Sequence, residues 1–417
     1  MAKQIFEGIK ILDFTWIGAG PQVGREFAEH GATVLRVESH RRPDGVRAAP
    51  PFKDGIPGIN RSAFGTAFNT NKLSMSLDLT YPKGAEVARR LVKWADVLAD
   101  SMTPGALARF GLDYESCRQI KPDIIYYSTC QMGQKGPLAT FGGYGIFAVA
   151  YAGHCYLTGW PDGEPNVLFN YYSDMVAPFY LVTAVAAALA YRRKMGKGMY
   201  LDQSQVEVGG SLLAPAMMDY LVNGRIAQRL GNTDPYMAPH SVYPCLGDDR
   251  WVAITVASGD EWRALASIIG EAWTGDARFA TFQGRKEHED ELDKLIAEWT
   301  REHAAEEVMA LLQERGVPAG AVKTAEDLFH DPQLKHRQHF RWLEHPEIGV
   351  HAYNAPAYTL SKTPAHIWRA GAPLGQDNEY AYKTILGMSD DEISDLMAAG
   401  TITTEDDVLA VLRGPKR

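Results

Sequence analysis

The chain has little cysteine and no clustered metal ligands. Its 417 residues contain four widely separated cysteines, Cys117, Cys130, Cys155 and Cys245. No Cys-x-x-Cys pair and no pair of histidines at zinc spacing accompanies them, so neither a zinc site nor a disulfide framework is indicated. We therefore interpret the cysteines as buried thiols of a reducing compartment, and we expect no metal site.

The sequence also lacks an excess of positive charge. Lys and Arg total 42 against 51 Asp and Glu, which gives a formal net charge of -9. Nucleic acids and anionic membrane surfaces bind proteins through clustered Lys and Arg side chains. Neither is expected as the main partner, and any anionic ligand has to be met by local basic groups.

Long apolar segments are scarce. The chain starts Met-Ala-Lys-Gln-Ile-Phe-Glu-Gly and has no apolar core of the kind a secretory signal needs, so a cytoplasmic location is expected. Only residues 175–191 approach membrane-spanning length, but this run is rich in alanine and contains Pro178 and Thr183. A helix buried in a large core explains it better than a membrane span.

Short apolar runs alternate with helical patterns through the first half of the chain. Strands are predicted at 9–14, 33–37, 73–79, 96–99, 123–129 and 199–202. Helices are predicted at 21–30, 83–94, 113–120, 175–191 and 205–222. This alternation predicts a Rossmann-like α/β fold with a doubly wound parallel sheet, in which ligands bind at the carboxyl ends of the strands.

The pattern changes after about residue 225. Two apolar runs, 241–245 and 251–257, flank Gly247-Asp248-Asp249 and predict a β-hairpin, and helices are predicted at 260–269 and 286–314. A chain of this length exceeds the usual limit of a single core, so more than one domain is expected. We predict a large Rossmann-like domain that begins with residues 1–205, a smaller α+β domain at 225–325, and a C-terminal segment, 330–417, that returns to the large domain.

A glycine-rich turn follows the first predicted strand. Gly18, Gly20 and Gly24 resemble a dinucleotide-binding fingerprint, but Gly24 falls four positions after Gly20 instead of three. Pro21 also lacks a backbone N–H that would face a pyrophosphate. The pattern favours a tight strand-to-helix turn, whose backbone comes close to a ligand, over a nicotinamide site.

Several single residues have both a functional and a structural interpretation. Arg109 follows a strand end, where a guanidinium can bind a phosphate, and Lys72 precedes a strand; a structural or surface role is the alternative for both. His154 and His240 are candidate bases. Neither accompanies a Ser or Cys at a nucleophile elbow, so a Ser-His-Asp site is not indicated.

Asp174 stands directly before the apolar run 175–191. Asp is among the best N-cap residues, so capping of this helix is the simplest interpretation of its position. Catalysis by the carboxylate is the alternative. No other strong nucleophile accompanies the predicted ligand-binding edge of the sheet.

Blocks along nearly the whole chain resemble those of the family III CoA-transferases, the CaiB/BaiF family that includes formyl-CoA and carnitine CoA-transferases. They include Gly196-Lys197-Gly198, and Ala372-Pro373-Leu374-Gly375 near the end of the chain. Each block is weak alone, but their shared order makes the resemblance strong. The other matching blocks are 8–15, 19–21, 31–32, 37–38, 71–72, 77–79, 95–97, 104–107, 133–137, 157–159, 201–202 and 378–379.

The resemblance implies an acyl-CoA:carboxylate CoA-transferase with Asp174 as its catalytic residue. In that family the aspartate attacks an acyl-CoA thioester, forms a mixed anhydride and then an aspartyl-CoA thioester, and passes CoA to an acceptor acid. The substrates are then an acyl-CoA donor and a carboxylic acid, with no permanently bound cofactor and no metal. An interlaced, ring-like homodimer is implied, and a heteromer with a paralogue is the alternative assembly.

The resemblance also places the binding residues. CoA contacts are implied for Ile17, Gly18, Ala19, Leu77, Ser101, Met102 and Arg109, with the backbone N–H groups of residues 17–19 available to the anhydride oxygens. Residues 234–240, which end in Pro239 and His240, replace the mobile glycine run of the formyl-CoA enzyme and form the implied substrate loop.

Departures from the formyl-CoA enzyme concern the substrate. Gly18 replaces a glutamine, Ser39 an arginine, and Thr80 and Cys130 two lysines. We therefore expect an acyl group larger than formyl. Aromatic residues near the predicted site indicate a bulky or aromatic acyl group, with core packing as the alternative; they are Trp16, Trp160, Phe169, Tyr171 and Tyr172.

Two other functions are compatible with the resemblance. The same superfamily contains α-methylacyl-CoA racemases, which use a His and an Asp as paired bases. Tyr144 stands where that histidine is expected, and His154 lies ten residues too late to replace it. The second alternative is a non-catalytic subunit of a heteromeric CoA-transferase, which the intact Asp174 disfavours.

Overall fold

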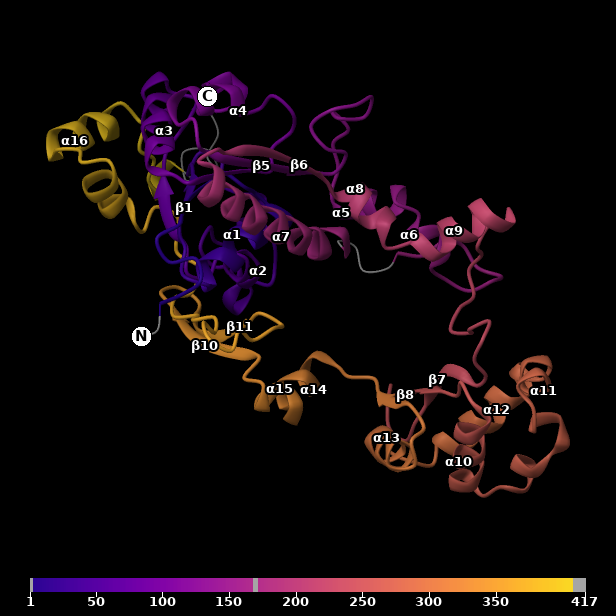
Figure 1. Cartoon of the computed structure of the whole chain (residues 1–417). Helices are drawn as coiled ribbons and strands as arrows, with labels where there is room; N and C mark the ends of the chain where they lie inside the picture. The colour runs from indigo at the N-terminus through magenta and orange to yellow at the C-terminus, as the bar shows by residue number, and fades with distance from the viewer. Residues whose placement is uncertain (1–2, 168–171, 408–417) are drawn as a thin grey trace, which may run out of the picture. The chain divides into compact units, whose positions relative to one another are not determined.

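The structure is a computed structural model that describes residues 3–167 and 172–407 (Figure 1). The chain divides into two compact units. The first unit comprises Met1–His154, Leu168–Met218 and Lys335–Arg417, and the second comprises Cys155–Val167 and Asp219–Leu334. The domain limits predicted from the sequence, 1–205, 225–325 and 330–417, remain predictions beside this division.

A six-stranded parallel sheet forms the centre of the first unit. Its strand order is β3-β2-β1-β4-β5-β6, and every neighbouring pair is parallel. This is the doubly wound order, in which successive strands are added on one side of β1 as far as β3 and then on its other side from β4 onward. The predicted Rossmann-like α/β class is therefore confirmed. The strands are β1 (Lys10–Asp13), β2 (Thr33–Glu38), β3 (Leu73–Ser76), β4 (Val97–Asp100), β5 (Ile125–Cys130) and β6 (Met199–Ser204).

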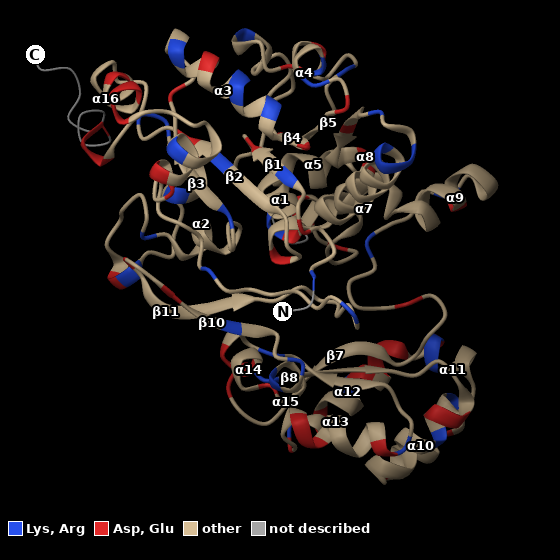
Figure 2. Cartoon of the chain, turned by 60° about the vertical axis from the view of Figure 1, so that its left-hand side comes forward, with Lys and Arg blue, Asp and Glu red and all other residues tan. Residues whose placement is uncertain are grey.

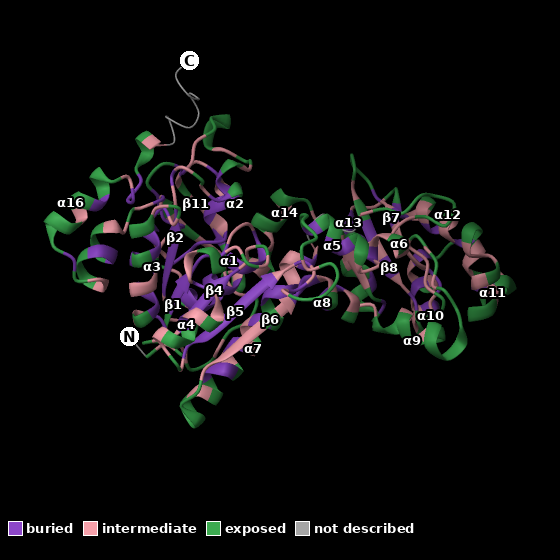
Figure 3. Ribbon diagram, turned by 90° about the horizontal axis from the view of Figure 1, so that it is seen from above, coloured by how far each residue is buried: buried purple, intermediate pink, exposed green. Residues whose placement is uncertain are grey.

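Helices cover both faces of this sheet (Figure 1). Alternate residues of a strand point to opposite faces of the sheet, so neighbouring residues of β1 belong to different cores. Ile11 belongs to a core with α1 (Ala19–Glu29) and α7 (Tyr172–Met195). Leu12 belongs to the opposite core with α3 (Pro82–Trp94) and α4 (Tyr114–Ile120). Figure 3 shows the strands as the most buried elements of the unit.

Helix α7 is long and apolar enough to cross a membrane by length and composition, and it is the single helix of this kind in the described part of the chain. It packs instead along the sheet beside α1. Leu181, Val185, Ala188 and Leu189 are buried in the shared core. The expectation of a buried core helix at 175–191 is met on one side of α7, whereas Phe179 and Tyr180 are 44% and 47% exposed.

Two long predicted helices are broken in the structure. The helix predicted at 205–222 is two helices, α8 (Gln205–Ser211) and α9 (Ala214–Asn223), and Pro215 lies in the first turn of the second, where proline is tolerated. The helix predicted at 286–314 is three: α11 (Phe282–Glu287), α12 (Glu289–Thr300) and α13 (Ala305–Glu314). His288 and Ala304 have non-helical backbone angles at these breaks. A continuous charge pattern does not reveal such local breaks.

The second unit contains a three-stranded antiparallel sheet. The predicted hairpin is present as β7 (His240–Pro244) and β8 (Trp251–Thr255), and β9 (Ala319–Ala321) extends the sheet. Helix α10 (Gly259–Ile269) starts with a capping box formed by Ser258 and Glu261. A separate apolar core unites this sheet with α10, α12 and α13. Acidic residues are frequent on α12 (Figure 2).

Residues 335–407 are the last described segment of the chain and belong to the first unit. The backbone N–H of Asp377 donates to the Ser74 carbonyl at 2.9 Å, and the Asn378 side chain accepts from the Ser76 N–H at 2.7 Å, so this segment is bonded to β3. The remaining elements are η1 (Gly45–Ala48), η2 (Lys53–Gly55), α2 (Ala63–Ala67), η3 (Ala108–Phe110), α5 (Gly145–Tyr151), α6 (His154–Leu157), η4 (Ala272–Gly275), η5 (Ala277–Phe279), α14 (Ala325–His330), α15 (Pro332–His336), β10 (Phe340–His345), β11 (Gly349–Asn354), the π-helix η6 (Tyr380–Ile385) and α16 (Asp390–Ala398).

Candidate active site at the carboxyl edge of the sheet

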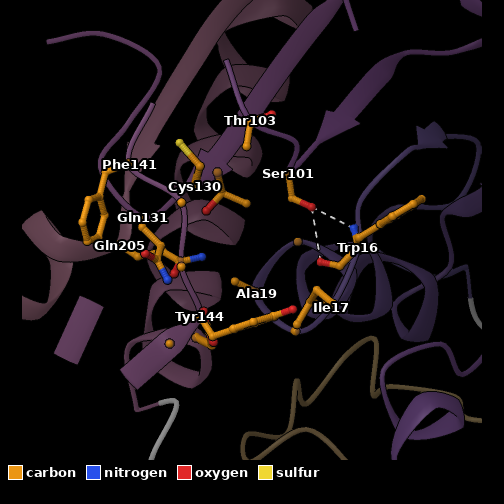
Figure 4. A pocket seen from close by; sticks show the side chains of 17 residues that line it. Trp16, Ile17, Ala19, Ser101, Thr103, Cys130, Gln131, Phe141, Tyr144 and Gln205 are labelled. Atoms are coloured by element: carbon orange, nitrogen blue, oxygen red, sulfur yellow. Dashed lines mark hydrogen bonds between the residues drawn. The ribbon is translucent and has the colours of Figure 1, made fainter. Parts of the chain in front are cut away.

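A cavity of about 150 Å³ lies where the strand order of the large sheet reverses. The loops that follow β1 and β4 contribute to its wall, as expected for ligand sites in doubly wound sheets. Figure 4 shows the cavity and its side chains. The lining residues are Trp16, Ile17, Gly18, Ala19, Gly20, Ser101, Thr103, Thr129, Cys130, Gln131, Phe141, Gly142, Gly143, Tyr144, Gly145, Asp174 and Gln205.

Asp174 lines this cavity from the first turn of α7. The interpretation of Asp174 as the helix cap is wrong, because the helix already includes Tyr172 and Ser173. Position 18 faces it: a Cβ added to Gly18 would lie 3.7 Å from the Asp174 Cβ. The glycine therefore leaves space directly beside the carboxylate.

Burial raises the pKa of Asp174 to about 6. No other described residue donates a hydrogen bond to this carboxylate. The effect of desolvation on its pKa is therefore not offset by a local donor. The positive end of α7 favours the ionised form over a neutral acid. At neutral pH the group is thus an anion that is poorly solvated, which is a suitable state for a nucleophile.

The loop after β1 is held in an unusual conformation. Ile17 has a φ of 67°, in the left-handed region that β-branched residues rarely adopt. Its backbone N–H donates to both carboxylate oxygens of Asp44, each at 3.0 Å. The expectation that the Ile17 N–H is available to a reaction intermediate is therefore wrong. Gly18 and Ala19, at the start of α1, have no partner for their N–H groups among the bonds of the described chain.

Asp44 belongs to a buried charge network. It forms an ion pair with Arg36, which also lies 3.3 Å from Glu38. Glu38 in turn binds Arg47 at 2.7 Å. Burial opposes ionisation of Glu38, but the charges of Arg36 and Arg47 prevail and lower its pKa to about 2. The loop after β1 is thus held, through Asp44, by a buried network of ion pairs.

Ser101 ties the loops of β1 and β4 together. Its hydroxyl oxygen accepts from the Trp16 N–H at 2.7 Å and lies 3.3 Å from the Trp16 carbonyl (Figure 4). The Trp16 ring faces the Arg42 guanidinium at 5.4 Å, which places a cation beside this end of the cavity.

Four of the seven predicted CoA contacts line the cavity: Ile17, Gly18, Ala19 and Ser101. The other three do not. The Leu77 side chain is 1% exposed and lies in the core under β3, and Met102 packs against the same core. Arg109 is exposed and stacks on Phe110 at 5.4 Å. Their implied contact with CoA remains a prediction.

The other sequence candidates have structural partners. Lys72 is buried and binds the Asp13 carboxylate and the Pro21 carbonyl, each at 2.8 Å. His154 is buried with Nε2 2.9 Å from the Gly209 carbonyl. Pro239 and His240 belong to the second unit, where His240 Nδ1 lies 2.7 Å from the Asn232 carbonyl.

The aromatic candidates separate in the structure. Trp16 lines the cavity, whereas Trp160 lies in the second unit and Tyr172 packs edge-on against His154 at 5.5 Å. Phe169 and Tyr171 lie outside the described residues. Tyr144 lines the cavity with an exposed ring, and its match to the racemase histidine remains a prediction.

The sequence interpretation missed Gln131, Phe141 and Gln205 among the lining residues. A signal was present for the two glutamines, because each directly follows a strand whose carboxyl end faces the site. Phe141 lies in a loop without such a signal. Cys117 and Cys245 are buried free thiols as expected, but Cys130 and Cys155 are only half-buried. Among the described residues, no group of three His, Cys, Asp or Glu side chains could hold a metal ion.

Known proteins are similar to this chain in sequence and in fold. Residues 6–378 match the family described as CoA-transferase family III. A succinate–glutarate CoA-transferase of Agrobacterium fabrum is 34% identical over 90% of this chain and 94% of its own length. A succinyl-CoA–D-citramalate CoA-transferase of Chloroflexus aurantiacus is 30% identical over 95% of this chain and 98% of its own. The crystal structure of a CaiB/BaiF family protein from Brucella suis superposes with a TM-score of 0.84 at 30% identity, covering 92% of this chain and 100% of that one.

Proposed function

Because the chain belongs to CoA-transferase family III, we propose that it moves CoA between carboxylic acids through covalent intermediates on Asp174. The enzyme is an acyl-CoA:carboxylate CoA-transferase whose substrates are a CoA thioester and a carboxylic acid. The observation that supports the covalent route is the desolvated Asp174 carboxylate on the cavity wall, with glycine opposite it.

The first half-reaction transfers CoA to the enzyme. An Asp174 oxygen attacks the thioester carbonyl carbon, the C–S bond breaks, and CoA thiolate leaves a mixed anhydride. The thiolate then attacks the Asp174 carbonyl carbon and releases the donor acid as a carboxylate. Asp174 is left as a CoA thioester. Negative charge develops on carbonyl oxygens in these steps, and we propose the N–H groups of Gly18 and Ala19, which line the cavity, as the donors that stabilise it.

The second half-reaction reverses this order with another acid. The acceptor carboxylate attacks the aspartyl-CoA thioester, CoA thiolate leaves, and an anhydride between Asp174 and the acceptor forms. Attack of the thiolate on the acceptor acyl carbon yields the new acyl-CoA and returns the free Asp174 carboxylate. Atoms and charge balance with no permanently bound cofactor.

Succinyl-CoA is the donor that we propose for this enzyme. The names of four relatives, from Agrobacterium fabrum, Homo sapiens and twice from Chloroflexus aurantiacus, contain succinate or succinyl-CoA. Succinyl is larger than formyl, in line with the departures at Gly18 and Cys130. Glutarate and other short dicarboxylic acids are the corresponding acceptors to test first.

A homodimer in the cytoplasm completes the proposal. Helix α9 has no buried residue although it is largely apolar, which supports burial against another chain. One relative is named as the beta subunit of a succinyl-CoA–L-malate CoA-transferase, so pairing with a paralogue is the alternative assembly.

Labelling of Asp174 tests the mechanism. Succinyl-CoA mixed with the enzyme alone should add the mass of CoA less one water to the peptide that carries Asp174, and hydroxylamine should remove it. Asp174→Asn should abolish both labelling and turnover, whereas the exposed control Asp162→Asn should retain both. Turnover by Asp174→Asn would overturn the covalent mechanism.

A further inference from the structure

Two glutamine side chains in the cavity wall make no hydrogen bonds within the described chain. Gln131 is 8% exposed and Gln205 is 6% exposed, and the Oε1 atom of each is inaccessible and without a partner. Both line the same cavity as Asp174. Figure 4 shows the two side chains together, next to Phe141.

A structural role does not explain these amides. The Gln131 backbone, not its side chain, joins the strand ends: its carbonyl accepts from the Val206 N–H and the Ser204 hydroxyl, each at 3.0 Å. Gln203, on the neighbouring strand, shows the structural alternative, because its Nε2 donates to the Ala177 carbonyl at 2.9 Å and its Oε1 accepts from Thr129 at 3.0 Å. Buried polar atoms without a hydrogen-bond partner are rare in folded proteins, so two such amide oxygens in one wall require an explanation.

The position of the amides matches the acyl end of a bound thioester. In Figure 4, Gln131, Gln205 and Phe141 lie on one side of the cavity, opposite Ser101 and Trp16. Ser101 and the Ile17–Ala19 turn are the proposed CoA contacts, so the acyl chain would extend toward the glutamines. No Lys, Arg or His is among the described residues that line the cavity. Thr103, Thr129 and Tyr144 also line the cavity, but among its lining residues the two glutamines are the ones with a buried polar atom that has no partner, so they are the groups that a polar acyl end would satisfy.

We propose that Gln131 and Gln205 form an acyl subsite that hydrogen-bonds an oxygen atom on the acyl chain beyond its reacting carbonyl. An amide can turn to present either its NH₂ or its carbonyl oxygen, so a distal carboxylate, carbonyl or hydroxyl satisfies the pair, whereas a hydrocarbon chain leaves it unpaired. This subsite rests on the proposed function, because it assumes that the acyl group lies in the cavity with Asp174. It makes the two glutamines specificity-determining residues.

Binding measurements in an Asp174→Ala background test the subsite without the covalent chemistry. We would measure the Kd of succinyl-CoA, 3-hydroxybutyryl-CoA and butyryl-CoA by calorimetry. One net hydrogen bond is worth about 1 kcal/mol, so at least one oxygenated thioester should bind about fivefold tighter than butyryl-CoA. Adding Gln131→Met or Gln205→Met should reduce that preference several-fold while the Kd of butyryl-CoA stays nearly constant.

The controls separate recognition from folding and from the mechanism. Gln22→Met removes an amide on α1 whose partner is Glu26, outside the cavity, and should leave the preference unchanged. Equal affinity for all three thioesters, or equal weakening of all three in the methionine variants, would overturn the subsite. Because Asp174→Ala cannot form the covalent intermediates, failure of the Asp174 labelling would refute the mechanism and leave this comparison valid.

Discussion

Both carboxylate oxygens of Asp44 lie 3.0 Å from the backbone nitrogen of Ile17. This contact holds a β-branched residue at positive φ, a conformation that costs on the order of 1 kcal/mol or more in an isolated chain. The next residue is Gly18, which faces Asp174. Asp44 therefore sets the wall opposite the proposed nucleophile, although it does not line the cavity itself.

Replacement of Asp44 by Asn should reduce both stability and turnover. The change removes one of the two carboxylates that pair with the buried Arg36 guanidinium and leaves only Glu38, which should lower the free energy of unfolding by about 3 kcal/mol. With the Ile17 turn loosened, kcat should fall at least about tenfold while the KM for the CoA thioester changes less. Urea unfolding and steady-state kinetics measure the two effects.

Asp54→Asn is the matched control for this loop. Asp54 pairs with Lys53 at 3.3 Å and Arg61 at 3.7 Å on an exposed surface, so its loss should cost less than about 0.5 kcal/mol and leave kcat unchanged. If Asp44→Asn behaves like this control, Asp44 does not position the turn.

The raised pKa of Asp174 predicts opposite pH trends for rate and stability. The nucleophile must be ionised, so the single-turnover rate of CoA transfer to the enzyme should rise with pH, reach half its maximum near pH 6 and level off roughly one pH unit higher. The folded protein binds this proton more tightly than the unfolded chain, whose Asp has a pKa near 3.8. The contribution of Asp174 to stability therefore falls as pH rises from about 4 to 6 and stays low above that range.

Asp174→Asn makes this trend measurable. The amide carries no charge at any pH, so the variant should be more stable than the wild type at pH 8 by on the order of 1 kcal/mol and should lose this advantage near pH 4.5. Urea unfolding at both pH values provides the comparison. An advantage that is equal at both would show that ionisation of Asp174 does not destabilise the fold.

The sequence predicted the parts of the site that depend on local patterns. The turn after β1, the helix that follows it and the helix at 113–120 follow from residue types and spacing, and the structure contains all three. The parallel sheet could be predicted as a fold class, because alternating strands and helices favour parallel sheets. Asp174 followed from the family resemblance, not from its position alone.

The parts that depend on distant contacts were not predictable. No sequence rule places an isoleucine at positive φ, and the contact that Asp44 makes with Ile17 joins residues 27 positions apart in the chain. Similarly, Arg109 follows a strand end as a ligand residue would, yet its side chain turns outward and stacks on Phe110. Such outcomes depend on how loops pack, and a loop sequence alone constrains this weakly.

Helix α9 carries an apolar surface that the described residues of the chain leave uncovered. None of its ten residues is buried, and Leu221 and Val222 are 68% and 78% exposed. Figure 2 shows the helix with almost no charge. Contiguous apolar surface of this kind marks a protein interface more often than free solvent exposure, and a second copy of the chain is the partner that we propose.

Charged residues on α9 should therefore break the dimer. Leu221→Glu combined with Val222→Glu would bury two unpaired carboxylates in an interface, which costs several kcal/mol, so sedimentation velocity should show a monomer where the wild type is a dimer. The control Ile56→Glu changes an exposed apolar residue outside α9, 57% exposed, and should leave the dimer intact. A wild-type enzyme that sediments as a fully active monomer would contradict the assembly, because α9 would then be exposed in the working protein.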